Sequence, residues 1–154
     1  MGLDISAYSR LQNNAGEDAV RIWRNPDFPG RADDLQDGGM YIPKGTLQFR
    51  AGSYSGYNEW REQLAKLAGY PAVTNKSKPH SEAAWQKDSG PFWELINFSD
   101  CEGTLGSAIC AKLAKDFDEF EERAAAIGGW FFDRYQLWQK AAHMAADNGA
   151  ICFH

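Results

Sequence analysis

Hydrophobic and polar positions alternate along the first stretch of the chain. In residues 2–11 every second side chain is apolar or small, as in a strand with one buried face. The alternation returns in residues 19–24, after a polar segment at residues 13–18 that has the composition of a turn. The two alternating runs therefore predict an antiparallel hairpin.

Strand-like patterns continue up to residue 50. Residues 25–39 are rich in Pro, Gly and Asp and predict a loop. Short apolar runs at residues 41–42 and 46–50 predict two further strands, on either side of Pro43-Lys44-Gly45.

The spacing of apolar residues then changes to that of a helix. A first helix is predicted to begin near Tyr57 or Asn58 and to stop at Gly69, which Pro71 follows. Residues 73–89 are polar and lysine-rich, and predict a loop with a short helical turn around Ala83-Ala84-Trp85.

Three more helices are predicted in the second half of the chain. Pro91 suits the first position of a short helix at residues 92–98. A longer helix is expected to begin at residues 104–105 and to end before Gly128-Gly129. A last helix is predicted from Trp130 to about residue 146.

The final residues, 150–154, are apolar again and predict a terminal strand. Strands thus dominate the first third of the chain, helices follow, and one strand returns at the end. This order predicts one α+β domain, residues 1–154, with an antiparallel sheet built from the N-terminal strands plus the C-terminal strand. Three to four helices are expected to pack on that sheet.

Composition and charge argue against general nucleic-acid binding, a membrane span and a cysteine metal site. A net charge of −5 and a pI near 5.2 argue against general nucleic-acid binding, which normally needs a basic face. No apolar run approaches the ~20 residues that span a bilayer, and we find no signal peptide. The three cysteines share no metal-type spacing and predict free thiols. We therefore expect a cytoplasmic protein without a membrane partner, a cofactor or a bound metal.

The segment Phe49–Arg61 concentrates polar side chains around two glycines, between a predicted strand and a predicted helix. Arginine matches phosphate geometry, tyrosine can stack on a base, and helix starts offer free N–H groups to anions. The predicted ligand-binding residues are Arg50, Ser53, Tyr54, Tyr57, Asn58, Arg61 and, in the following loop, Trp85. The alternative is a plain strand-to-helix connection whose glycines only make the turn.

Acidic side chains offer a second set of candidates. Asp100 and Glu102, two residues apart, fit an acid–base pair or a cation site, or equally the capping of the helix that follows. Asp4 has two candidate partners, Arg50 and Arg61. The acidic run at residues 116–122 is compatible with a solvated helix face or with a surface for a basic partner protein.

Three sequence blocks carry a resemblance to other proteins. They are Met1-Gly2-Leu3-Asp4-Ile5, the block from Arg50 to Arg61 (RAGSYSGYNEWR) and the block from Phe98 to Gly106 (FSDCEGTLG). Together they resemble a group of small phage, prophage and bacterial proteins. The resemblance brings no activity with it, but small phage accessory proteins often counter host defence by sequestering a nucleotide signal or by blocking a defence protein.

Three functional hypotheses follow. The first is a phage-type accessory protein of the host cytosol that binds and sequesters a small anionic, nucleotide-derived ligand. The second is a small hydrolase or transferase that acts on a phosphorylated or glycosidic substrate through Asp100 and Glu102. The third is an acidic inhibitor of a host defence protein. Because the chain is rich in aromatic residues, a homo-oligomer is also expected.

Overall fold

The main sheet has four antiparallel strands. The computed structural model describes all residues, 1–154. The strands are β1 (Leu3–Ser9), β5 (Gly45–Gly52), β6 (Gly103–Gly106) and β7 (Ala150–Phe153), and their order is β5-β1-β7-β6. The prediction that the C-terminal strand joins the N-terminal ones is confirmed, since β7 pairs directly with β1.

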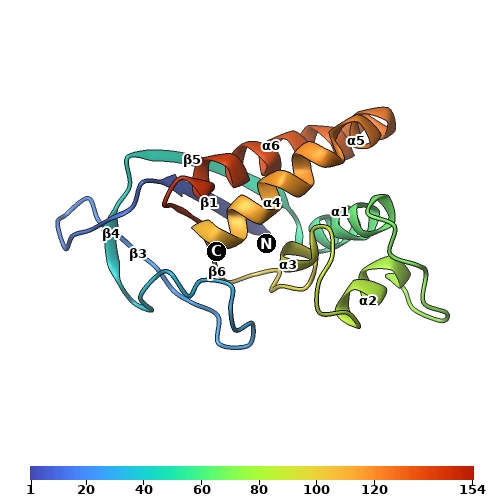
Figure 1. Cartoon of the computed structure of the whole chain (residues 1–154), viewed down its shortest axis with the longest axis horizontal. Coiled ribbons are helices and arrows are strands. Elements are labelled where there is room, and N and C mark those ends of the chain that lie inside the picture. Colours follow the sequence, from blue (N-terminus) through green and yellow to red (C-terminus); the bar gives the residue numbers. More distant parts are fainter.

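A small second sheet lies at one end of the molecule (Figure 1) and contains β2 (Gln12–Asn13), β4 (Met40–Ile42) and β3 (Val20–Arg21), in the order β2-β4-β3. The predicted hairpin between residues 2–11 and 19–24 is therefore wrong. β1 pairs with β5 and β7 instead, and β3 pairs with β4. Alternation reveals that a strand has two unlike faces, but it does not reveal which strand lies beside it.

Six helices complete the chain, and the α+β class is confirmed. They are α1 (Tyr54–Leu67), α2 (Pro79–Trp85), α3 (Trp93–Ile96), α4 (Ser107–Glu119), α5 (Glu121–Ile127) and α6 (Gly129–Ala146). Figure 1 shows α4 and α6 running side by side, with α1, α2 and α3 grouped at the end of the molecule away from the small sheet. α1, α4 and α6 contact the main sheet directly.

Two helix starts differ from the sequence prediction. α1 begins at Tyr54, one turn early, because the Ser53 hydroxyl accepts a 3.0 Å hydrogen bond from the Gly56 amide and caps the helix. α4 begins at Ser107, because residues 103–106 pair with β7 as strand β6. The glycines of both segments suggested a loop or the start of a helix. In the structure the Ser53 cap sets where α1 begins, and pairing with β7 makes residues 103–106 a strand.

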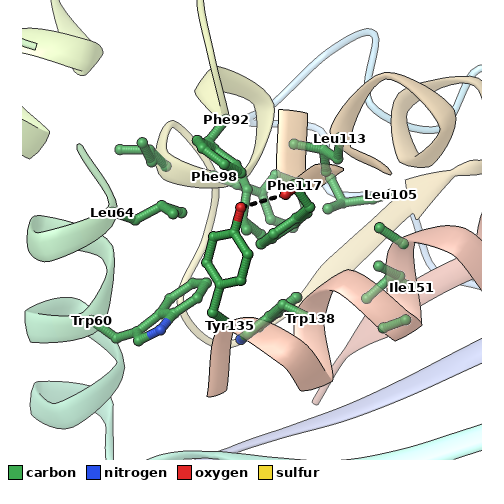
Figure 2. Packing of buried hydrophobic residues seen from close by; sticks show 14 of the residues in the cluster. Trp60, Leu64, Phe92, Phe98, Leu105, Leu113, Phe117, Tyr135, Trp138 and Ile151 are labelled. Atoms are coloured by element: carbon green, nitrogen blue, oxygen red, sulfur yellow. Dashed lines mark hydrogen bonds between the residues drawn. The ribbon is translucent and has the colours of Figure 1, made fainter. Parts of the chain in front are cut away.

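Most of the aromatic side chains of the chain pack in the core. Tyr57, Trp60 and Trp138 stack on one another at ring-centroid distances of 5.7–6.1 Å, and all three are at most 1% exposed. In Figure 2 the Tyr135 hydroxyl donates a hydrogen bond to the Phe117 carbonyl in the middle of this cluster. Each buried aromatic or aliphatic side chain contributes about 1.5–3 kcal/mol. Most of the aromatic residues thus pack within one chain, whereas Trp23, Trp85 and Trp130 are exposed, and the number of aromatic residues alone does not require an oligomer.

None of the six helices combines the length and the apolar character that crossing a membrane requires.

Candidate functional site

Asn58 connects α1 to the turn that precedes β6. Its side-chain amide donates to the Tyr54 carbonyl and to an Asp100 carboxylate oxygen, each at 2.9 Å. Its side-chain oxygen accepts a hydrogen bond from Arg61. The structure therefore places Asp100 beside the predicted ligand-binding segment of α1.

Arg61 is buried, with 7% of its surface exposed, and it forms hydrogen bonds with backbone carbonyls in α3 and just after it. Its guanidinium donates to the carbonyls of Leu95, Ile96 and Phe98 at 2.7–3.4 Å. A helix of four residues leaves its last carbonyls without intrahelical partners. Arg31, also buried, donates to the carbonyls of residues 94 and 97. Two arginines thus satisfy five consecutive carbonyl groups, and Arg61 has a structural role.

Arg50 lies on the main sheet, away from Arg61. It is paired in register with Asp4 on β1, and a guanidinium nitrogen lies 3.2 Å from the carboxylate. A hydrogen bond and the positive charge of Arg50 hold the pKa of Asp4 below its usual range. Of the two candidate partners of Asp4, the structure therefore selects Arg50. Both side chains remain about half exposed.

The tyrosines of the segment face the core. Tyr57 is fully buried, so the structure corrects its predicted place in a ligand pocket. Burial raises the pKa of Tyr57 to about 12. Arg61 lies over its ring, 4.7 Å from the centroid, and the hydroxyl has no hydrogen-bond partner. Tyr54 is partly buried against the same core, and the Ser53 hydroxyl is used as the helix cap.

Three of the predicted residues nevertheless meet in one hollow between α1 and α2. Its volume is about 340 Å³, within the ~300–1,000 Å³ of typical small-molecule pockets. We call it the lysine hollow, and its lining includes Asn58, Arg61, Lys76, Lys78, Ser81 and Trp85. The lining carries three positive side chains and one negative one, Glu82. Its charge therefore favours an anion.

The polar groups of the lysine hollow differ in their availability. Lys78 contacts Glu59 at 2.7 Å, whereas Lys76 lies 3.9 Å from Glu82, at the limit of an ion pair. The buried hydroxyl of Ser81 has no hydrogen-bond partner. A buried hydroxyl without a partner is costly, and the closed position of the Ser81 oxygen keeps it out of the set of groups that a ligand in the hollow can reach.

The start of α2 is already occupied by a carboxylate. Glu62 on α1 accepts hydrogen bonds from the amides of His80 and Ser81 at 2.8–3.1 Å. An anion in the lysine hollow would therefore be held by side chains rather than by these amides.

Trp85 ends α2 and lines the lysine hollow. Its indole is 45% exposed, and its edge packs against Phe28 at a centroid distance of 5.8 Å. An exposed ring held on a helix can provide a stacking surface. The sequence prediction missed the two lysines and Ser81, although Lys76 and Lys78 stood close to Trp85 in the segment predicted as a loop.

Asp100 and Glu102 face different surroundings. Asp100 contacts Asn58, whereas Glu102 lines a separate hollow on the main sheet, described below. Neither residue caps the following helix, so the capping interpretation is wrong. Asp34 caps α4 instead, because its carboxylate accepts from both the amide (2.9 Å) and the hydroxyl (2.6 Å) of Ser107.

Two of the acidic side chains in the run at residues 116–122 already have partners within the chain. Asp116 accepts hydrogen bonds from the Phe92 amide (2.9 Å) and pairs with Lys112 (2.7 Å). Asp118 contacts His143 at 2.8 Å. The remaining glutamates of the run are exposed, so the acidic surface is smaller than the sequence indicated.

The structure contains no group of three or more His, Cys, Asp or Glu side chains that could hold a metal ion. All three cysteines are free thiols.

No protein-family model matches this chain, and searches of the curated proteins and of the solved structures find no match either.

Proposed function

We propose that this protein binds a small anionic, nucleotide-derived ligand in the lysine hollow. One observation carries the proposal. Asn58, Arg61 and Trp85, chosen from the sequence for this chemistry, line the same hollow as Lys76 and Lys78.

Each part of such a ligand has a matching group in the lysine hollow. Lys76 and Lys78 suit a phosphate, because charge-assisted hydrogen bonds contribute about 1.5–3 kcal/mol each. Trp85 suits the base, since stacking of a base on an aromatic ring contributes about 1–3 kcal/mol. Arg61 adds a fixed positive charge close to the same hollow.

The ligand is held without turnover in this proposal. Neither Asp100 nor Glu102 lines the lysine hollow, so no pair of carboxylates converges on a substrate there. Retention without hydrolysis suits a protein that sequesters a nucleotide signal in the host cytosol, one of the ways in which small phage accessory proteins counter host defence.

The test is native mass spectrometry of the protein with a panel of cyclic and linear nucleotides, followed by calorimetry on any nucleotide that is retained. We expect one panel member to be retained intact. The double variant Lys76→Ala/Lys78→Ala should then bind at least tenfold more weakly, and Trp85→Ala should also weaken binding. The exposed Lys87 lies on the same segment but outside the lysine hollow, so Lys87→Ala is the matched control.

Two outcomes would contradict the proposal. One is a panel in which no nucleotide is retained, and the other is full affinity in the double lysine variant. Breakdown of a nucleotide that depends on Asp100 would instead support the hydrolase hypothesis, and the same spectra reveal it as a product mass.

A further inference from the structure

The main sheet has one face without helices. The side chains of Ser6, Thr104 and Cys152 form a row across this face, because Ser6 and Thr104 are both in register with Cys152 on β7. The opposite face, with Ile5, Leu105 and Ile151, packs into the helical core. The row is partly covered by residues 20–23, and a hollow of about 580 Å³ remains between them and the strands.

The rims of this sheet-face hollow are fixed to each other. The Thr104 hydroxyl donates to the Trp23 carbonyl at 2.7 Å, and the Asn25 side-chain amide donates to the Glu102 carbonyl at 3.1 Å. Two backbone amides of the preceding turn, those of Cys101 and Glu102, bond to the Ser99 hydroxyl. Trp23 and Glu102 therefore line the hollow from backbone segments that are held in place without a ligand.

The hollow combines an apolar wall with an unused carboxylate. Six of its eleven lining residues are hydrophobic, and they include Tyr8, Val20 and Trp23. Trp23 is 59% exposed, which is unusual for such a large aromatic residue. Arg21 lies over its ring at 5.7 Å from the centroid and donates to the Gly38 carbonyl, and more than half of the surface of Trp23 stays open for stacking. The Glu102 carboxylate forms no ion pair.

We propose that the sheet-face hollow is a second binding site, for an uncharged planar heteroaromatic ring with adjacent N–H donors. Trp23 stacks on the ring, and Glu102 accepts two hydrogen bonds from its donor edge. Guanine has such an edge, with a ring N–H beside an amino group, whereas adenine has an acceptor beside its amino group. The site is separate from the lysine hollow, whose lining it does not share.

Guanosine is the probe, because it has this edge but lacks the phosphate that the lysine hollow is proposed to hold. The readout is the set of indole N–H signals in a ¹H–¹⁵N spectrum of the full chain. Variants Trp23→Phe and Trp85→Phe assign one signal to each hollow. We expect saturable shifts of the Trp23 signal with guanosine and at least tenfold weaker binding of adenosine.

The Glu102→Gln variant tests the donor edge. It should bind guanosine at least tenfold more weakly, whereas Glu17→Gln, on an exposed turn, should bind as the parent chain does. Both side chains lie at the surface, so neither change should affect folding. A Trp23 signal that does not move at millimolar guanosine would overturn the proposal. So would full affinity in Glu102→Gln, or shifts confined to Trp85.

Discussion

Five consecutive backbone carbonyls, from residue 94 to residue 98, receive their hydrogen bonds from the side chains of Arg31 and Arg61. At the scale of single residues, these hydrogen bonds explain how the charged side chains of Arg31 and Arg61 can be buried, because the carbonyl oxygens replace the water that each guanidinium loses. A guanidinium has five donors in a fixed plane, so it can serve several carbonyls at once. Arg61 therefore belongs to the scaffold of the lysine hollow.

Arg61→Ala is expected to destabilise the fold by about 3 kcal/mol or more, because it leaves three carbonyls of a buried turn without donors. Urea unfolding at neutral pH measures the change. Arg61→Lys should recover only part of the loss, since an ammonium group cannot match the planar donor set. A loss below about 1 kcal/mol in Arg61→Ala would show that solvent replaces the guanidinium.

Tyr57→Phe should be neutral at pH 7 or stabilise the fold by about 1 kcal/mol, because the buried hydroxyl it removes has no partner. Urea unfolding of the parent chain and the variant measures the difference. A clear destabilisation would mean that the hydroxyl has a hydrogen bond in solution.

The same tyrosine predicts a dependence on alkaline pH. The pKa of Tyr57 in the fold is about 12, whereas an unfolded tyrosine ionises near 10. Above pH 10 the unfolded state loses the proton first, so the free energy of unfolding falls as the pH rises from 10 toward 12. At about 1.4 kcal/mol per pH unit, the fall from this one residue is of the order of 1 kcal/mol by pH 11.

Urea unfolding between pH 8 and 11 tests this dependence. Tyr57→Phe should show a smaller fall than the parent chain. It should keep a residual fall, because burial also raises the pKa of Tyr70 and Tyr135. Equal slopes in the two proteins would contradict the prediction.

At the scale of elements, the start of α4 depends on a residue more than seventy positions earlier. Gly106 at its N-cap offers no side chain, and Asp34 from the long loop supplies the missing acceptor. The carboxylate also lies at the positive end of the helix dipole. The loop at residues 25–39 is thus held to the helical layer by a cap.

Asp34→Ala should lower the free energy of unfolding by about 1–2 kcal/mol, the usual effect of losing an N-cap acceptor. The neighbouring Asp33 forms an exposed ion pair with Arg24 at 3.0 Å, and Asp33→Ala should cost less than about 1 kcal/mol. Thermal or urea unfolding of the two variants compares them directly. Equal effects would mean that Asp34 does not cap α4 in solution.

At the scale of the whole molecule, the main sheet joins the two ends of the chain. β7 lies between β1 and β6, so the last residues hold interior positions of the sheet, and the two backbone hydrogen bonds between Asp4 and His154 extend the pairing. Helices α1, α4 and α6 cover one face of that sheet, and the two hollows lie outside this core.

Deletion of residues 150–154 should therefore prevent cooperative folding. It removes a central strand together with Ile151 and Phe153, which are at most 4% exposed. Near-UV circular dichroism and the dispersion of amide NMR signals measure the loss. The substitution His154→Ala, beyond the last strand residue, is the control and should leave the fold intact. A folded truncated chain would contradict the central role of β7.

The local pattern of the sequence determined the α+β class, the last helix and the terminal strand, because side-chain periodicity and glycine stops act over a few residues. It also selected Asn58, Arg61 and Trp85 by their chemistry. Only the tertiary structure decided which strands pair and that β6 is a strand. It also showed that Tyr57 and Arg61 are buried and that Asp34 caps α4. Lys76 and Lys78 line the same hollow as Trp85, which the local pattern did not indicate. These depend on contacts between residues distant in sequence, whose geometry local periodicity does not encode.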